Sequence, residues 1–138
     1  MNFMAQSYFT KGNKNHMLRN NEIETISYVF LEFLNSLNVH ESWLDKIKIQ
    51  LEDINRGEYL PLTTINFDKL IPAKMNNDFV DLLKGLLNYL RQNGDYISKD
   101  YLNSFYERGL ADRAGYTMDL PITFFENHIN KIIYLFEN

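Results

Sequence analysis

The chain of 138 residues contains no cysteine. This absence excludes disulfides, thiolate nucleophiles and zinc sites built from cysteine, and it is compatible with a reducing compartment. Long apolar runs are also absent: the longest, Tyr28 to Leu34, is interrupted by Glu32 and falls far short of the ~18 residues that a membrane span needs. The first ten residues, MNFMAQSYFT, lack the apolar core of a signal peptide. We therefore expect a cytoplasmic protein with no membrane segment.

Motifs for nucleotide, metal and hydrolase chemistry are missing as well. The chain has no G-x-x-x-x-G-K-[ST], G-x-G-x-x-G, H-E-x-x-H, EF-hand or G-x-S-x-G pattern. His16, His40 and His128 are far apart in sequence, and no two of them have the spacing of metal ligands on a helix. We expect no metal, no cofactor and no catalytic residue, and we favour a protein that is not an enzyme.

The residues that are present indicate a soluble globular protein. Apolar residues make up 45% of the chain and charged residues 23%, which predicts one compact domain over residues 1–138. The formal net charge of −4 argues against general binding of nucleic acid by the whole domain. It fits, equally weakly, a protein that meets a basic partner.

Apolar residues spaced three and four apart predict helices over much of the chain. The first helix is expected over 22–37, capped by Asn21 with Glu24 as the reciprocal partner. The second is expected over 78–93, between the cap Asn77 and the stop Gly94, and the third over 99–113, between the cap Ser98 and the stop Gly115. A C-terminal helix is expected to have Pro121 in its first turn. Val80, Leu83 and Leu87 form a second apolar stripe on helix 78–93, and Gly85 permits close packing there. We expect that helix to be buried centrally.

The segment 45–67 fits two descriptions. Ile47, Ile49 and Leu51 alternate with polar residues as in a strand, whereas Leu44, Ile47, Leu51 and Ile54 have helical spacing. We predict a strand, because a turn signal at 55–58 and the β-rich YLPLTTINF follow; Pro61 confines that second strand to an edge or a bulge. Residues 3–10 indicate an edge strand and 11–21 a loop. The predicted fold is α+β and predominantly helical, with about four helices, a small antiparallel sheet or hairpin around 45–67 and an N-terminal edge strand.

Two stretches are candidates for recognition. The first, Tyr8–Asn21, carries Lys11, Lys14 and Arg19 without an acid and is either a phosphate-binding arm or a polar connection. We favour the connection, because three charges are few and acids follow directly.

The second stretch, Ser104–Met118, brings together residue types that anchor protein interfaces, Tyr106, Arg108, Arg113 and Tyr116. Gly109, expected inside a helix, suggests a close approach at that point. The alternative, which we favour, is that Arg108 pairs with Asp112 on the surface and that Tyr106 is a core residue.

Other residues have open roles. Tyr28 and Leu31 lie off the core stripe of helix 22–37 and are assigned neither to the core nor to an interface. Asp100, Asn103 and Glu107 share one helix face, where acid–base chemistry is conceivable but a solvated polar face is favoured.

The favoured function is a non-enzymatic protein-binding module, of the inhibitor or immunity type found among phage anti-defence and toxin-neutralising proteins. This is an analogy of size and composition. The partner would be a protein, for instance a nuclease or another nucleic-acid-binding protein, with steering by acids. The expected steering acids are Glu22, Glu24, Glu32, Glu41 and Asp45, and the expected partner-binding residues are Lys11, Lys14, Arg19, Glu24, Glu32, Tyr28, Leu31, Tyr106, Arg108, Arg113 and Tyr116.

Three alternatives stay open. The first is a small enzyme or ligand-binding domain with a Tyr/carboxylate pocket, marked by a buried carboxylate near a tyrosine. The second is a nucleic-acid-binding regulator that uses the basic N-terminal arm, and charge ranks it last. The third concerns assembly, since a homodimer is compatible with the sequence.

Overall fold

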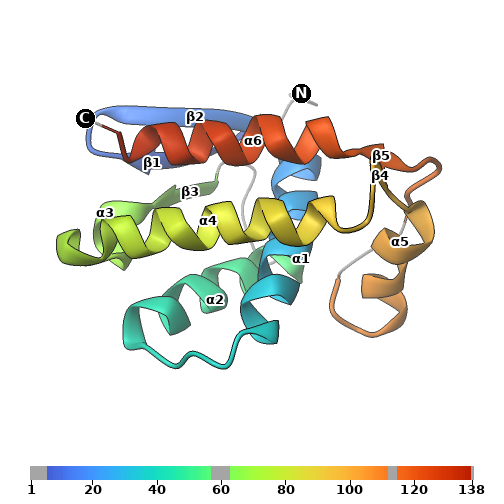
Figure 1. Cartoon of the computed structure of the whole chain (residues 1–138), viewed down its shortest axis with the longest axis horizontal. Coiled ribbons are helices and arrows are strands. Elements are labelled where there is room, and N and C mark those ends of the chain that lie inside the picture. The colour runs from blue at the N-terminus through green and yellow to red at the C-terminus, as the bar shows by residue number, and fades with distance from the viewer. Residues whose placement is uncertain (1–5, 57–62, 112–114, 138) are drawn as a thin grey trace.

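The computed structural model describes residues 6–56, 63–111 and 115–137. Helices dominate, and the expected mainly helical α+β class is confirmed (Figure 1). The elements, in chain order, are β1 (Gln6–Lys11), β2 (Lys14–Arg19), α1 (Asn20–Ser36), α2 (Ser42–Asn55), β3 (Thr63–Asn66), α3 (Phe67–Leu70), the 3-10 turn η1 (Ala73–Met75), α4 (Asn76–Arg91), β4 (Tyr96–Ile97), α5 (Lys99–Glu107), β5 (Leu120–Pro121) and α6 (Ile122–Leu135).

The larger sheet has the order β2-β1-β3, with β1 antiparallel to β2 and parallel to β3. The expected N-terminal strand is present as β1, which lies between β2 and β3 and not at the edge of this sheet. The loop predicted for 11–21 is wrong, since β2 occupies most of it. Gly12 and Asn13 form the two-residue turn, and Gly12 takes a positive φ of 60°, as a hairpin with glycine first requires. One face of the sheet is buried, through Ser7, Phe9, His16, Leu18 and Ile65.

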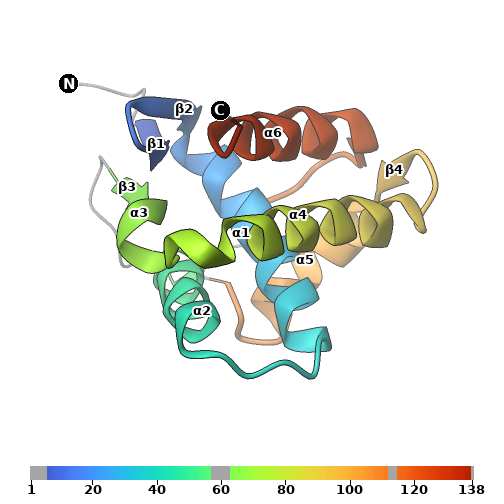
Figure 2. The same ribbon diagram turned by 60° about the vertical axis from the view of Figure 1, so that its left-hand side comes forward.

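Helix α1 runs through the middle of the molecule, between α4 and α2, while α6 lies beside the β1–β2 hairpin (Figures 1 and 2). Every residue of α1 from Ile23 to Leu31 is buried. Its neighbours contribute an aromatic cluster centred on Phe79, whose ring lies 5.1–6.5 Å from the rings of Phe30, Trp43, Phe67 and Phe136. Each such burial contributes about 1.5–3 kcal/mol of transfer free energy, so this cluster is a main source of stability.

The strand predicted over 45–54 is wrong, because α2 covers Ser42–Asn55. Leu44, Ile47 and Leu51 are buried as the helical spacing requires, whereas Ile49 is 55% exposed. A strand would have placed Ile49 on the same face as Ile47 and Leu51. The strand expected after the turn is present as β3, and Pro61 lies outside the described residues.

Of the residues predicted to cap helices, Ser98 is confirmed and Asn21 is wrong. Asn21 does not cap α1: the N-cap is Arg19, whose N–H donates to the Glu22 carboxylate at 2.8 Å. Ser98 does cap α5, accepting from the Tyr101 N–H at 3.1 Å. Asn77 lies inside α4, and Pro121 is the N-cap of α6 rather than part of its first turn.

Two glycines fix local geometry. Gly109 is not inside a helix: α5 ends at Glu107, and Gly109 follows with a φ of 74°, while the Leu110 N–H bonds to the Phe105 carbonyl at 2.8 Å. This is a Schellman stop, so the predicted stop at Gly115 is wrong. Gly85 faces Phe33, and a Cβ on it would lie 3.1 Å from the Phe33 ring. The expected close packing of α4 at Gly85 is therefore confirmed, and α4 buries five apolar residues.

Candidate functional site

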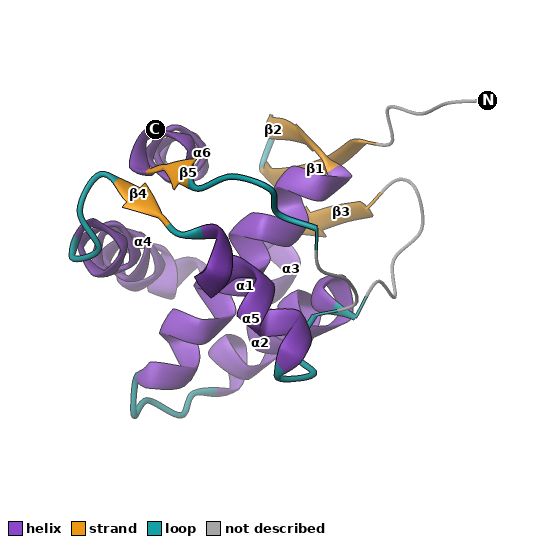
Figure 3. Ribbon diagram, turned by 90° about the vertical axis from the view of Figure 1, so that its right-hand side faces the viewer, coloured by secondary structure: helices purple, strands orange, loops and turns teal. Residues whose placement is uncertain are grey.

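The described residues between Asp95 and Ile122 (95–111 and 115–122) leave and rejoin the rest of the fold at the same place, as a closed excursion that we call the α5 arm (Figure 3). The Ile122 N–H donates to the Asp95 carbonyl at 2.8 Å, and β4 pairs with β5 directly beyond this bond. The Lys99 N–H donates to the Asp119 carboxylate at 2.9 Å and ties the returning chain to the start of α5. The arm is thus closed at its base, with both stems fixed.

Asn103 holds the returning loop against α5. Its Oδ1 accepts from the backbone N–H groups of Gly115 and Tyr116, each at 3.0 Å, and its Nδ2 donates to the Tyr116 carbonyl at 3.0 Å. The Tyr116 hydroxyl reaches α1, where it shares a short hydrogen bond with the Thr25 hydroxyl. Asn103 and Tyr116 therefore order the arm. Asn103 is committed to the loop, which counts against a role beside Asp100 and Glu107 in acid–base chemistry.

The buried side of α5 fastens the arm to the core. Leu102 and Phe105 are buried, and the Phe105 ring stacks on Tyr28 at a centroid distance of 5.5 Å. Burial, and to a lesser degree the neighbouring Tyr89 and Glu32, raises the pKa of the Tyr101 hydroxyl, so it stays neutral at ordinary pH. Tyr28 and Leu31 are both buried, which resolves their position in favour of the core.

The arm carries a disproportionate share of the exposed apolar surface. Within the described residues, eight large apolar side chains are exposed, and four of these belong to the arm. They are Tyr96 at 59%, Tyr106 at 51%, Leu110 at 43% and Met118 at 67%. Tyr106 was predicted to be a core residue, and that preference is wrong. Met118 and Tyr96 were not selected from the sequence, because each lies outside a regular apolar period. The apolar spacing places Leu110 on one helix face with Leu102 and Phe105, but α5 ends at Glu107 and Leu110 is exposed.

Arg108 is fixed in place at the end of α5. Its guanidinium lies 3.2 Å from the Glu32 carboxylate of α1 and 4.9 Å from the centre of the Phe105 ring. The partner expected from sequence, Asp112, and the candidate Arg113 both lie outside the described residues. Arg108 therefore presents an oriented guanidinium at the end of α5, held by a contact between residues 76 positions apart.

A cleft of about 610 Å³ opens at the base of the arm. Its walls come from the end of α4 and the start of α6, and Tyr96 contributes from β4. The Arg91–Glu126 ion pair, at 2.7 Å, lies in this wall. The cleft extends the exposed surface of the arm toward the core.

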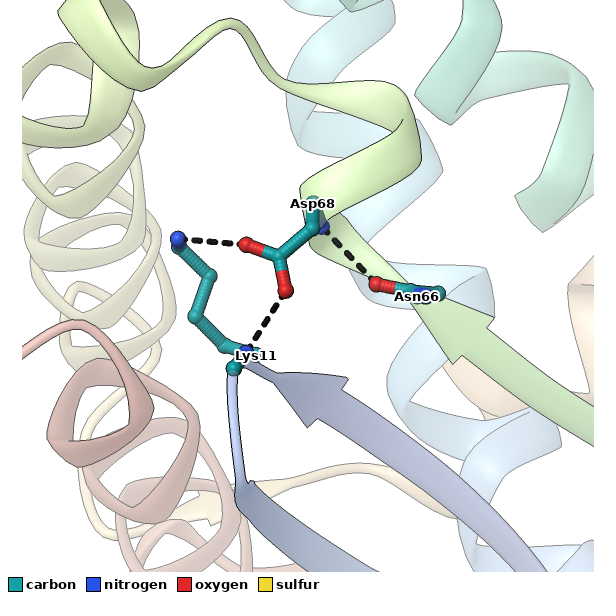
Figure 4. A network of polar contacts seen from close by, with 4 residues as sticks. Lys11, Asn66 and Asp68 are labelled. Carbon is teal, nitrogen blue, oxygen red and sulfur yellow. Dashed lines mark hydrogen bonds and ion pairs between the residues drawn. The ribbon is translucent and has the colours of Figure 1, made fainter.

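The basic N-terminal stretch is used inside the molecule. The Asp68 carboxylate accepts from the Lys11 ammonium at 2.7 Å and from the Gly12 N–H at 2.6 Å (Figure 4). These bonds lower the pKa of Asp68 below its ordinary value. Lys14 donates to the carbonyl of Tyr134 in the last turn of α6 and to that of Glu137 just beyond the helix, and lies 4.4 Å from the centre of the Tyr134 ring. These contacts favour the structural connection over the phosphate-binding arm; Arg19 is exposed and caps α1.

A pair of histidines joins three elements. His16 Nε2 lies 2.9 Å from His128 Nδ1, and His128 Nε2 lies 3.5 Å from the Glu22 carboxylate, so β2, α6 and the first turn of α1 meet here. Burial lowers the pKa of His16 to about 4, with repulsion from His128 and Lys131 adding to it. Burial also lowers the pKa of His128, against the attraction of Glu22. The pair is therefore neutral at ordinary pH. Because His16 and His128 are 112 positions apart, sequence spacing could not predict their contact.

A buried carboxylate near a tyrosine, the feature expected of an enzyme pocket, is present in the structure. Glu24 is buried, and the Tyr28 hydroxyl donates to its carboxylate at 3.3 Å. The cavity beside Tyr28, lined also by Asn55, has a volume of about 30 Å³, which holds one or two waters. Within the described segments, no group of three or more His, Asp or Glu side chains is arranged to hold a metal. The cavity beside Tyr28 is therefore too small to admit a substrate.

The acids expected to steer a partner have different environments. Glu22 and Glu32 bond to other elements and Glu24 is buried, whereas Glu41 and Asp45, at the start of α2, are exposed.

Across the three described ranges, no helix has the length and apolar character needed to cross a membrane. No family model, curated protein or solved structure matches the chain.

Proposed function

We propose that this chain is a non-enzymatic protein-binding module of the inhibitor type, and that it binds its partner through the α5 arm. The observation that carries the proposal is the concentration of exposed Tyr96, Tyr106, Leu110 and Met118 on one closed excursion. Large apolar side chains gathered on one surface mark interaction sites more often than scattered ones do. Tyrosine and arginine are also the residue types that most often dominate binding energy.

The arrangement of the arm favours rigid docking. Arg108 is held by Glu32 and Phe105, and the loop after α5 is held by Asn103, so little conformational entropy is lost when these groups meet a partner. The arm's exposed side chains are separate from the buried Leu102 and Phe105 that attach it. A partner can therefore cover them without unfolding any element. A rigid surface that covers a partner's groove excludes other ligands from that groove, which is how such a module inhibits.

Capture from a lysate tests this proposal. The tagged full-length chain is incubated with a nuclease-treated lysate of the organism that encodes it, next to the double variant Tyr106→Ala/Met118→Ala. The control variant Val39→Ala/Ile49→Ala removes the same kind of exposed apolar surface near the start of α2 and on its outer face. Both variants leave buried residues intact, so both are expected to keep the stability of the parent.

The expected result is a protein retained by the parent and by the control, and lost from the Tyr106→Ala/Met118→Ala variant. The same protein retained equally by all three forms would contradict the arm as the binding site. Retention that disappears with nuclease treatment would instead favour the nucleic-acid-binding alternative and the exposed face of the hairpin.

A further inference from the structure

The outward face of α5 is acidic. Leu102 and Phe105 are the buried residues of this helix, and at ~100° per residue the direction opposite to them passes through Asp100 and Glu107. Both carboxylates are exposed, and seven residues of helix separate them by about 10 Å along the axis. Tyr106 lies on the flank of the helix that also carries Asn103, toward the loop that leads to Met118.

The bases of the arm do not balance these acids. Residues 95–122 contain five acids and three bases, a formal charge of −2. Of the bases, Arg108 is already paired with Glu32. Two other exposed acids, Glu41 and Asp45, belong to a different part of the molecule. They lie at the start of α2, at the lower left of Figure 1, whereas α5 lies at the right of that figure. On the arm, exposed carboxylates and exposed aromatic side chains therefore occur together.

We propose that the partner of the α5 arm is a protein with a basic groove, in which lysine or arginine side chains about 10 Å apart flank an apolar depression. Tyr106 and Met118 fill the depression, and Asp100 and Glu107 face the basic side chains. This inference rests on the proposed function and adds the chemistry of the partner to it. The charge pairing accelerates encounter, while the apolar contacts set the lifetime of the complex.

A titration that needs no natural partner tests the chemistry directly. The ¹⁵N-labelled full-length protein is titrated with a synthetic helical peptide of alternating arginine and leucine, and amide chemical shifts are followed. We expect shifts at Asp100, Tyr106, Glu107 and Met118 that weaken as salt is added. Shifts centred on Glu41 and Asp45, shifts spread over all acids, or no shifts at all would overturn the inference.

The captured partner gives the second test. Neutralising the arm with Asp100→Asn/Glu107→Gln is expected to lower the association rate about tenfold at low salt and to change it little at high salt. The control Glu41→Gln/Asp45→Asn removes the same charge from α2 and is expected to leave the rate unchanged. Equal losses in both variants would overturn the inference. A partner that needs Tyr106 and Met118 but binds equally fast after neutralisation would overturn it too, while leaving the proposed function intact.

Discussion

The β1–β2 hairpin and the α5 arm differ in what their candidate binding residues contact. Residues 6–19 carry three bases and no acid, yet Lys11 is bonded to Asp68 and Lys14 to the end of α6. The arm has a mixed charge and a less regular sequence, yet it exposes Tyr106, Met118 and the carboxylates of Asp100 and Glu107. The conspicuous run of basic residues thus serves the fold, whereas the surface that we propose for a partner lies in a stretch with a weaker sequence signal.

The largest expected contrast is in stability. Phe9→Ala removes a ring that is 2% exposed and stacked on Phe67 at 5.5 Å, and we expect it to lower the free energy of unfolding by about 3–5 kcal/mol. Tyr106→Ala, on the arm, is expected to change it by less than about 0.5 kcal/mol. Urea denaturation of both variants measures the difference. A cost above about 1 kcal/mol for Tyr106→Ala would mean that this ring supports the fold, and the comparison would fail.

The histidine pair beside the hairpin makes stability depend on pH. His16 titrates near pH 4 in the folded protein and near 6.5 when unfolded, and the pKa of His128 is lowered as well. The unfolded chain therefore takes up protons first, so the stabilisation is complete above pH 6.5 and decreases toward pH 4, by about 1–3 kcal/mol.

Chemical denaturation across this pH range, with His16→Gln alongside, measures that slope. The variant is expected to lose most of it, while Tyr106→Ala keeps it. Asp68 acts in a separate window, since its lowered pKa removes stability only as the pH falls below 3.8. An unchanged slope in His16→Gln would show that the acid sensitivity comes from other groups.

A smaller effect is expected at the Lys11–Asp68 ion pair. A double-mutant cycle with Lys11→Met and Asp68→Asn is expected to give a coupling of about 0.2–1 kcal/mol, reduced because the Asp68 side chain is 42% exposed and decreasing with salt. Thermal unfolding of the four proteins measures it. Zero coupling, combined with salt-sensitive binding of single-stranded DNA by the parent, would return Lys11 to the role of a phosphate ligand.

The smallest stability effect is expected at Arg108. Its side chain is 44% exposed and its partner Glu32 is 28% exposed, so Arg108→Ala is expected to cost about 0.5 kcal/mol or less. Affinity for the captured partner should fall by more than this change in stability explains, because Arg108 belongs to the proposed interface and its guanidinium is already oriented by Glu32 and Phe105. Arg91→Ala, which breaks the ion pair with Glu126, is the matched control. Equal losses of affinity in the two variants would remove Arg108 from the interface.

The sequence predicted the elements whose pattern is local. The apolar spacing located α1, α4 and α6, and Ser98 marked the start of α5. It could not decide α2, because Ile47 and Leu51 satisfy both the strand and the helix period, and only the exposure of Ile49 separates them. The strand β2 has just two inward side chains, His16 and Leu18, and its formation depends on pairing with β1.

The sequence predicted the segment that holds the candidate site but not the contacts made by its residues. The segment Ser104–Met118 was singled out for its tyrosines and arginines, but the partner of Arg108 is Glu32 on another helix, and this could not be read from local spacing. Met118 follows no period, since it lies in a loop whose path is set by Asn103 and Asp119. Contacts between residues far apart in sequence therefore decide which of the arm's side chains face solvent.

The bond between Asp95 and Ile122 brings the two stems of the arm together at the surface of the core. An insertion whose ends meet in this way can be lengthened, shortened or exchanged with little change in loop-closure entropy. The scaffold and the proposed recognition surface are then separable units of sequence: substitutions within the arm leave the packing of α1, α4 and α6 unchanged. The same geometry makes the core a candidate carrier for grafted loops. A replacement has to supply the buried side chains of the arm, which are Ile97, Leu102, Phe105 and Ile122.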